Sequence, residues 1–341
     1  MEFWSDGVME CWVGPKPSTP TLQYSSTPAI LAMSDAGLLE ELSVIVGLKV
    51  KSDEPLARYT SMKIGGPADY FIEAQDDAAL RQVLPLLGRY GAALCLLGNG
   101  SNVLISDRGV RGAVIRLAGI FKRVEWREDE TGVSVEVGAA YPVTQLVREA
   151  ARRGYAGLEF AEGIPGTMGG ALVMNAGAYG SEFEKIVDQV EGVTQEGGVV
   201  CFARTQMNFT YRDANLPQGM VVTRVRLRLS KQEASQVSSK LRELVTRRKS
   251  SQPSGYPNSG SMFRNPPGDF AGRLIEAAEL KGKRIGQAQI SERHANFIVN
   301  LGAAKADDVR QLMDLARAEV KQRFGVELTA EVKYMGDWPA V

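Results

Sequence analysis

A glycine-dense segment in the middle of the chain limits its fold more than any other feature. Seven of the 25 residues from 157 to 181 are glycine, whereas average usage is about 7%. Glycine is favoured where φ is positive or where a backbone must approach a ligand closely. A run of tight turns is one interpretation of this segment. The other is a loop that lies along a large cofactor, with Thr167, Asn175 and backbone amides as donors.

A second glycine motif, LGNGSN at 97–102, lies between apolar runs at 93–97 and 103–117 that are expected to be buried strands. Two glycines one residue apart, followed by Ser101 and Asn102, can expose consecutive backbone N–H groups to a phosphate. A simple hairpin turn is the alternative. The motif lacks the third glycine and the opening helix of a dinucleotide fingerprint, and the chain contains no GxxxxGK loop.

Apolar spacing divides the rest of the chain into predicted helices and strands. The helices are expected at 36–50, 78–91, 143–154, 235–249 and 306–324. Further strands are expected at 133–138 and 221–230, and a polar break is expected at 51–58. Because helices and strands mix without strict alternation, the pattern predicts an α+β fold rather than a doubly wound sheet.

The charge balance and the histidine count exclude several classes of function. Lys plus Arg and Asp plus Glu both total 40, so the chain lacks the basic excess of a nucleic-acid-binding protein. His294 is the single histidine of the sequence. A zinc site built from several histidines is therefore excluded, no metal is expected, and a Ser-His-Asp triad is disfavoured.

Three cysteines without a CxxC pair suit a reducing cytosol. No stretch approaches the ~18 consecutive apolar residues that would cross a bilayer. The first 35 residues are rich in Ser, Thr and Pro and lack the pattern of a secretion signal. We therefore expect a flexible extension over 1–35, followed by a soluble cytoplasmic protein without membrane contact.

The two glycine motifs, together with YTSMKIGGPADYF at 59–71, resemble the flavin-binding half of the UDP-N-acetylenolpyruvoylglucosamine reductase (MurB) family. Later segments agree in the same order: YRD (211–213), SGSMFRNP (259–266), AGRLIEAAELKGKRIGQAQISERHANFIVN (271–300) and FGVELTAEVKYMG (324–336). The resemblance spans roughly Pro55 to Gly336. It is specific because these separate matches occur together and in the same order.

The resemblance implies a vanillyl-alcohol-oxidase-type FAD domain of two α+β subdomains, followed by an α+β substrate-binding domain. The expected ranges are 36–118 and 119–232 for the subdomains, 233–325 for the substrate domain, and 326–341 for a C-terminal segment. Only 48 residues separate Arg212 from Ser261, so the chain resembles the shorter, type II members, which lack an extra tyrosine-bearing loop. The residues after YRD depart from the family's usual serine.

The implied activity is reduction of the enolpyruvyl ether of UDP-N-acetylglucosamine to UDP-N-acetylmuramate, a step of peptidoglycan precursor synthesis, with noncovalent FAD and with NADPH as reductant. We expect a monomer. The implied cofactor contacts are Thr60, Ile64, Gly98, Asn99, Gly100, Ser101, Asn102, Gly163, Gly166, Thr167, Gly169, Gly170, Asn175 and Gly177. The implied substrate contacts are Tyr211, Lys249, Asn265, Lys281 and His294. Arg248 is an alternative to Lys249, and a hydrogen-bonded structural role is the alternative for His294.

The implied catalytic residues are Arg212, Ser261 and Glu331, and their chemistry suits the reaction. Hydride addition to the terminal carbon leaves negative charge on the carboxylate-conjugated unit, which needs preorganised partners. Arg212 offers a planar cationic fork, a neutral Glu331 could donate a hydrogen bond, and Ser261 could protonate the adjacent carbon.

Each catalytic residue also has a simpler interpretation. Arg212 could be a surface residue paired with Asp213, Ser261 a turn serine, and Glu331 an exposed strand residue. At the level of the whole chain, two other functions compete with the reductase. One is another flavin oxidase or dehydrogenase of the same fold, and the other is a flavin-binding module without catalysis.

Overall fold

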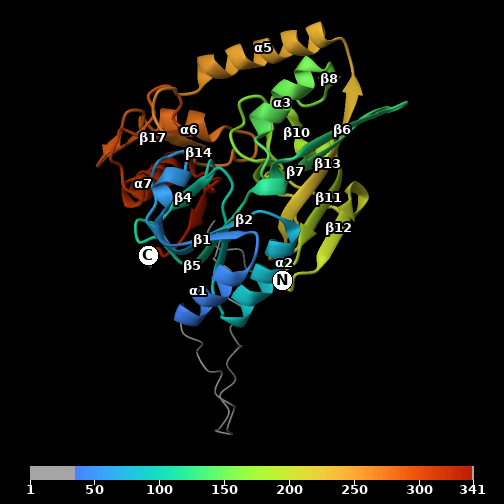
Figure 1. The fold of residues 1–341 in the computed structure, drawn as a ribbon. Helices are drawn as coiled ribbons and strands as arrows, with labels where there is room; N and C mark the ends of the chain where they lie inside the picture. The colour runs from blue at the N-terminus through green and yellow to red at the C-terminus, as the bar shows by residue number, and fades with distance from the viewer. Residues whose placement is uncertain (1–34, 340–341) are drawn as a thin grey trace, which may run out of the picture.

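The computed structural model describes residues 35–339. Apart from Asp35, the predicted extension over 1–35 lies outside these residues. The first unit of the fold is a four-stranded sheet in the order β1-β2-β5-β3, in which β1 and β2 are antiparallel and β2, β5 and β3 are parallel (Figure 1). Its elements are α1 (Asp35–Val44), β1 (Leu48–Pro55), η1 (Leu56–Tyr59), β2 (Pro67–Ala74), α2 (Asp77–Arg89), β3 (Leu94–Leu96), β4 (Val103–Ile105), β5 (Val110–Leu117) and η2 (Gly119–Lys122).

The second unit is an antiparallel sheet in the order β12-β11-β13-β7-β6, with β8 paired to the end of β13. Its strands are β6 (Val124–Asp129), β7 (Gly132–Gly138), β8 (Tyr155–Ala156), β9 (Gly177–Ala178), β10 (Ser181–Glu182), β11 (Val187–Val193), β12 (Val199–Ala203) and β13 (Val221–Lys231). Its helical elements are α3 (Val143–Arg152), η3 (Glu159–Ala161), α4 (Met168–Val173), η4 (Phe183–Lys185), η5 (Arg204–Gln206) and α5 (Ala234–Ser251). Helix α5 packs on α3, β8 and η3.

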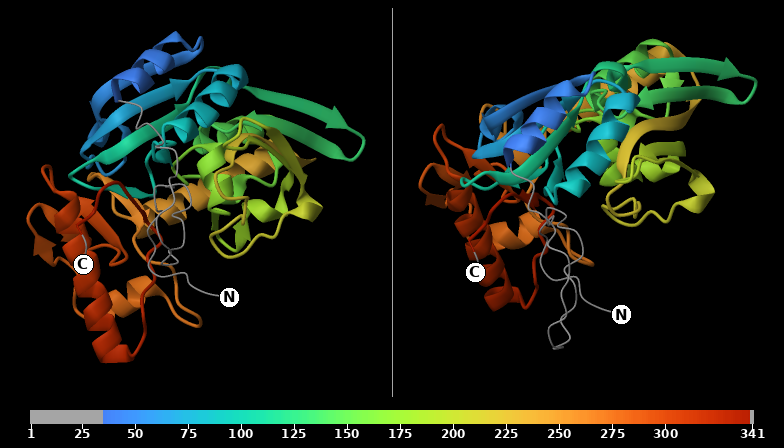
Figure 2. Two further views of the ribbon diagram at one scale, coloured as in Figure 1. Left: turned by 90° about the horizontal axis from the view of Figure 1, so that it is seen from below. Right: turned by 60° about the horizontal axis from the view of Figure 1, so that its bottom comes forward.

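The third unit is a small antiparallel sheet in the order β14-β17-β16-β15, packed against two helices. Its elements are β14 (Asn258–Ser261), α6 (Ala271–Ala277), β15 (Arg284–Ile285), β16 (Ala288–Ile290), β17 (Phe297–Asn300) and α7 (Ala306–Phe324). One face of α7 is buried, with Val309, Leu312, Met313, Ala316 and Val320 in a core that also includes Met62 and Leu104 of the first unit. Figure 2 shows the three units as lobes, with the β6–β7 ribbon projecting from the second.

The end of the chain returns to the first unit. Strand β18 (Lys333–Met335) runs parallel to β4, so Lys333 pairs with Val103 and Met335 with Ile105. Asp107, just after β4, accepts the backbone N–H groups of Ala306 and Asp307 at 2.9 and 3.1 Å and thereby caps α7. A carboxylate at a helix N-terminus satisfies donors that lack intrahelical partners. The first and third units are therefore joined by a strand pair and by a helix cap.

Most predicted elements are confirmed, including the α+β arrangement. The helix predicted at 36–50 is wrong in its second half, because the helix ends at Val44 and Gly47 has a φ of +89°. The polar break predicted at 51–58 is also wrong, since most of it belongs to the exposed strand β1. Within the part of the chain that the structure describes, strand β1 is at the edge of its sheet and pairs with β2 alone, so its outer residues can be polar. Of the helices in the described part of the chain, none is long and apolar enough to span a membrane.

Candidate active site

A cavity of about 1660 Å³ is lined by residues of all three units. The first unit contributes 94–103, the second contributes many residues between 164 and 178 and between 212 and 222, and the third contributes 259–261 with Phe297. Glu331 and Lys333 border the cavity from the C-terminal segment. Small-molecule pockets usually measure about 300–1,000 Å³, so this cavity has room for an extended dinucleotide and a second ligand.

The loop at 97–102 leads from one sheet to another. Strand β3 before it pairs with β5, whereas β4 after it pairs with β18. The alternative interpretation as a hairpin turn is therefore wrong. Gly100 in this loop has a φ of +59°, and a Cβ there would lie 2.3 Å from the carbonyl oxygen of Tyr59. Only glycine fits this position without moving the backbone.

The second glycine-rich loop lies directly against the first. Ser101 Oγ donates a hydrogen bond of 3.1 Å to the Pro165 carbonyl oxygen. A Cβ on Gly98 would lie 2.7 Å from Thr167 Oγ1. The Gly169 N–H donates to the Ala139 carbonyl oxygen at 2.8 Å. The absence of side chains at these glycines lets the two loops form one continuous wall of the cavity.

Ten of the fourteen implied cofactor contacts line this cavity: Gly98, Asn99, Gly100, Ser101, Asn102, Gly166, Thr167, Gly169, Gly170 and Gly177. Thr60, Ile64, Gly163 and Asn175 are not among the lining residues. Thr60 is buried behind Gly100, and its Oγ1 donates to the Ile64 carbonyl oxygen at 2.9 Å. A Cβ on Gly163 would lie 2.6 Å from Arg248 Cδ, so its contact is with α5.

Asn175 differs most from its expected role as a donor to the cofactor. Its side chain is fully buried. The amide nitrogen donates to the Thr210 carbonyl oxygen at 3.1 Å, and the amide oxygen accepts the Glu184 N–H at 3.0 Å. Both ends of the amide are thus used within the protein, and Asn175 holds the loop in place from behind.

Gly100→Ala is expected to destabilise the protein by more than ~2 kcal/mol and to lower its FAD content. The new Cβ would meet backbone at 2.3 Å and would also carry the ~1–2 kcal/mol cost of a left-handed residue. Gly91→Ala is the matched control, because Gly91 has a φ of +62° but faces open space. Thermal unfolding and the flavin-to-protein absorbance ratio measure both effects. Equal effects of the two substitutions would show that the close approach to Tyr59 is unimportant.

The predicted catalytic residues Arg212 and Glu331 meet at the cavity. Arg212 Nε lies 3.2 Å from Glu331 Oε1, and the two side chains are 20% and 18% exposed. Arg212 Nη2 also donates to the Gly177 carbonyl oxygen at 3.2 Å. Arg212 therefore pairs with Glu331 rather than with Asp213. It adopts a φ of +62° in a tight turn closed by the backbone pair of Thr210 and Asp213.

Glu331 lies just before β18, and two hydrogen bonds of its backbone fix its position. Its N–H donates to the Met262 carbonyl oxygen at 2.8 Å, and its carbonyl oxygen accepts the Asn102 side-chain amide at 3.2 Å. Burial raises the pKa of Glu331, and the charges of Arg212 and Arg264 partly oppose that rise. The interpretation as an exposed strand residue is wrong, and the environment favours the neutral acid more than water does.

Ser261 ends β14, where it pairs with Phe297, and borders the same cavity. Its neighbour Met262 is the residue whose carbonyl oxygen holds Glu331. Within residues 35–339, Ser261 Oγ makes no hydrogen bond. Its hydroxyl is therefore available to a ligand in the cavity, as a proton donor must be.

The five implied substrate contacts lie outside the lining of the cavity. Tyr211 is exposed, with its ring centroid 4.9 Å from the Arg212 guanidinium carbon. Lys249 is exposed, whereas its alternative, Arg248, borders the cavity and donates to the Glu162 carbonyl oxygen at 3.4 Å. Asn265 Oδ1 accepts the Ala271 N–H and so caps α6.

The remaining two substrate contacts lie together in the third unit. Lys281 Nζ pairs with Glu276 at 2.6 Å. His294 Nδ1 accepts the Asn296 N–H at 3.2 Å, and burial lowers the pKa of the ring. This hydrogen bond is the one expected of a structural histidine.

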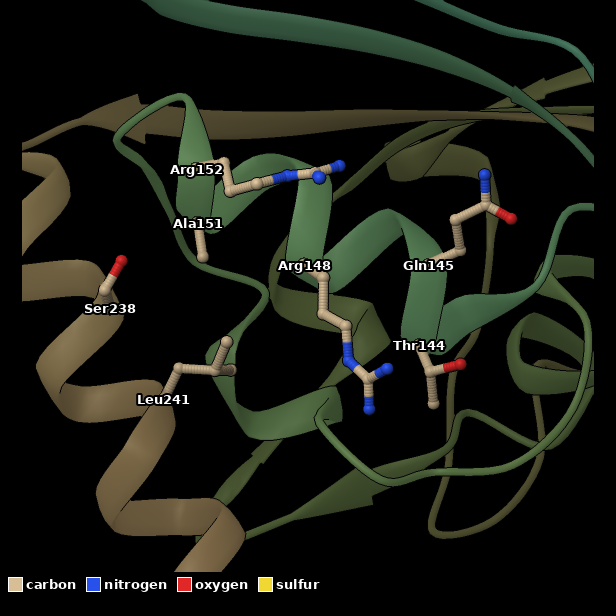
Figure 3. Close-up of a pocket in the computed structure, with 7 residues that line it drawn as sticks. All are labelled: Thr144, Gln145, Arg148, Ala151, Arg152, Ser238 and Leu241. Atoms are coloured by element: carbon tan, nitrogen blue, oxygen red, sulfur yellow. The ribbon is translucent and has the colours of Figure 1, made fainter.

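Lys333 borders the cavity and was missed from the sequence. The signal for it was its position two residues after Glu331 in an extended segment, because such residues share a face. Another, smaller cavity of about 460 Å³ lies between α3 and α5. Figure 3 shows Ser238 and Leu241 of α5 across from Arg148 and its neighbours on α3. In the described residues, no group of three or more His, Cys, Asp or Glu is placed to hold a metal ion.

Two glycine-rich loops against a cavity large enough for a dinucleotide, with a further C-terminal unit beside it, are the features of a dinucleotide-binding protein. Family models agree: residues 68–202 match an FAD-binding domain, and residues 252–335 match the C-terminal domain of UDP-N-acetylenolpyruvoylglucosamine reductase. The chain belongs to the UDP-N-acetylenolpyruvoylglucosamine reductase family, and the resemblance inferred from its motifs is confirmed.

Curated relatives and a solved structure support this assignment over most of the chain. It is 46% identical over 293 residues to UDP-N-acetylenolpyruvoylglucosamine reductase 2 of Symbiobacterium thermophilum, covering 85% of this chain and 94% of the relative. A reductase of Rubrobacter xylanophilus is 46% identical over 289 residues, 84% of this chain and 95% of the relative. The crystal structure of the Thermus caldophilus reductase (MurB) matches with a TM-score of 0.72 and 38% identity, over 84% of this chain and 98% of that one.

Proposed function

We propose that this protein reduces the enolpyruvyl ether of UDP-N-acetylglucosamine to UDP-N-acetylmuramate, with NADPH as reductant and noncovalent FAD, in peptidoglycan precursor synthesis. The observation that carries the proposal is the Arg212–Glu331 pair on the wall of the cavity that Ser261 and both glycine-rich loops also line. We further propose that it acts as a monomer in the cytoplasm.

The glycine-rich loops supply the contacts for FAD. The loops pack closely on Thr167, Tyr59 and Ala139 because Gly98, Gly100 and Gly169 have no side chains. Ser101, Asn102 and Thr167 add polar groups along the wall of the cavity. FAD, when bound, supplies the hydride of the reaction. The chain's own residues bind and orient the substrate and manage charge and protons.

Arg212 and Glu331 stabilise the negative charge that develops on the substrate. The Arg212 guanidinium is permanently charged and offers a planar fork to the carboxylate of the enol ether. Once that carboxylate binds Arg212, the Arg212 charge is shared between two anions and stabilises the ionised form of Glu331 less. Burial, which raises the pKa of Glu331, then favours the protonated acid. A protonated Glu331 donates a hydrogen bond to the enolate oxygen, where it is of most use in the transition state.

Ser261 transfers its hydroxyl proton to the carbon next to the one that receives hydride, and the hydroxyl is then reprotonated from solvent. Its Oγ is free of hydrogen bonds within the described chain, so no internal bond must break first. Arg248 extends the cationic lining of the cavity. Lys281, His294, Asn265, Tyr211 and Lys249 remain our proposed substrate contacts, at positions outside the lining.

The purified protein is expected to be yellow and to release FAD into the supernatant on denaturation. The sole histidine, His294, lies in the third unit, away from the glycine-rich loops, so it is not placed to tether flavin. NADPH should bleach the flavin absorbance without oxygen, and the enolpyruvyl ether should restore it. Restoration by oxygen alone at a comparable rate would favour an oxidase, and flavin that precipitates with the chain would indicate a covalent link.

A further inference from the structure

Lys333 borders the cavity at the point where the C-terminal segment meets the loop at 97–102. Its backbone N–H donates to the Asn102 carbonyl oxygen at 3.0 Å, so Lys333 adjoins the end of the glycine loop at 97–102. It also follows Glu331 by two residues, and both side chains border the cavity. The lysine therefore lies where the cofactor loop meets the Arg212–Glu331 pair.

The Lys333 ammonium lacks a partner inside the protein. Across residues 35–339, no hydrogen bond or ion pair involves its Nζ. Its side chain is half-buried, and Arg264 and Asp213 are the charged groups that act on it. Burial, together with the charge of Arg264, lowers the pKa of Lys333. A half-buried cation without a partner is costly, so a ligand that pairs with it gains binding energy.

The charged groups around Glu331 also include more cations than carboxylates. Among the described residues, the charges that act on Glu331 and Lys333 are those of Arg212, Arg264 and Asp213, so this group of five holds three cations and two carboxylates. Arg264 Nε is buried and also has no hydrogen-bond partner among the described residues. Together with Arg264, which acts on Glu331 and Lys333 without lining the cavity, this region carries one more positive than negative charge and suits a bound anion.

We propose that Lys333 forms an anion subsite beside the Arg212–Glu331 pair, and that this subsite binds a delocalised anion of a bound ligand. Two ligands could supply that anion. One is the carboxylate of the enolpyruvyl ether, and for this source the inference rests on the proposed function. The other source is the negative charge that FAD carries when reduced, which requires only that FAD binds. In both cases the lysine acts as a fixed positive charge.

The test compares Lys333→Met, which keeps length and loses charge, with Lys333→Arg, which keeps the charge. The first arm measures affinity for UDP-N-acetylmuramate, which has the carboxylate, and for UDP-N-acetylglucosamine, which lacks it. The second arm measures the midpoint potential of the flavin. Lys321→Met is the control for loss of one positive charge, since Lys321 is an exposed residue of α7 paired with Glu327.

If the substrate carboxylate occupies the subsite, Lys333→Met weakens UDP-N-acetylmuramate binding at least ~10-fold and leaves UDP-N-acetylglucosamine binding unchanged. If the negative charge of the reduced cofactor occupies the subsite, the midpoint potential of the flavin in Lys333→Met becomes more negative. The affinities for both nucleotides then stay at their wild-type values. Lys333→Arg is expected to retain most of either property. The proposal is overturned if neither property changes beyond the Lys321→Met control, or if the arginine variant is as impaired as the methionine variant.

Two further outcomes are decisive as well. If Lys333→Met does not retain FAD, Lys333→Gln replaces it, and if both neutral variants lose FAD, FAD affinity becomes the readout. Lys333→Arg must then bind FAD like the wild type, and an equal loss would overturn the subsite. If the wild-type protein binds neither nucleotide, the proposed function fails, while the midpoint potential still decides the role of Lys333.

Discussion

Ser261→Ala is expected to slow reoxidation of the flavin by the enolpyruvyl substrate by ~10²–10⁴-fold, the usual contribution of a positioned general acid. Reduction of the flavin by NADPH should stay close to the wild-type rate, because no carbon is protonated in that step. Rapid-mixing absorbance of each half-reaction separates the two effects. The half-buried Ser261 at the end of β14, which borders the cavity and whose Oγ makes no hydrogen bond among the described residues, is the structural basis for this selectivity.

Two further variants make the result specific to the hydroxyl of Ser261. Ser261→Cys should recover part of the rate, since a thiol can donate a proton from nearly the same position. Ser259→Ala is the matched control on the same strand, because the Ser259 hydroxyl donates to the Val103 carbonyl oxygen and is already used. If the Ser261→Ala variant reoxidises at the wild-type rate, the proton comes from another group.

Glu331→Ala is expected to lower the rate of the same half-reaction by ~10²–10³-fold, the effect of removing one transition-state hydrogen-bond donor. Glu331→Gln should be much less impaired, because an amide also donates. If the ionised carboxylate of Glu331 acts instead through its negative charge, the Glu331→Gln variant should be as impaired as the Glu331→Ala variant. Single-turnover reoxidation of the reduced protein distinguishes the two.

The pH dependence of reoxidation provides a separate test of the protonation state of Glu331. Burial raises the pKa of this carboxyl, so its protonated form persists to higher pH than that of a free glutamate. The wild-type rate should therefore fall as the pH rises through this raised pKa. The Glu331→Gln variant has no such group and should lack that part of the profile. An identical alkaline fall in both proteins would assign it to another residue.

Local sequence was sufficient for most of the secondary structure. The helix at 78–91 was predicted despite Pro85, and the structure places α2 at Asp77–Arg89 with Asp76 as its N-cap. The helix expected to continue to residue 50 failed because tertiary pairing of β1 with β2 outweighed helical apolar spacing beyond Gly47. The helix propensity of a segment does not include the free energy that the segment gains by pairing with a strand elsewhere in the chain.

The site was accessible from sequence only in part. Motifs identified Arg212, Ser261 and Glu331, but their proximity depends on a turn, a strand end and a C-terminal segment that are far apart along the chain. Asn175 was assigned to the cofactor because its residue type and loop fit a donor. Its burial behind the loop arises from packing with Thr210 and Glu184, which spacing cannot reveal.

The parallel pair of β4 and β18 affects how the protein is made. In the described chain β4 pairs with β18 alone, so its edge has no partner until the residues around 333 have been synthesised. At ~5–20 residues per second, a ribosome needs about 10–50 s to cover that interval. An unpaired strand edge invites association with other chains during this time. The wall that carries Glu331 and Lys333 is thus completed only after both β4 and β18 have been synthesised.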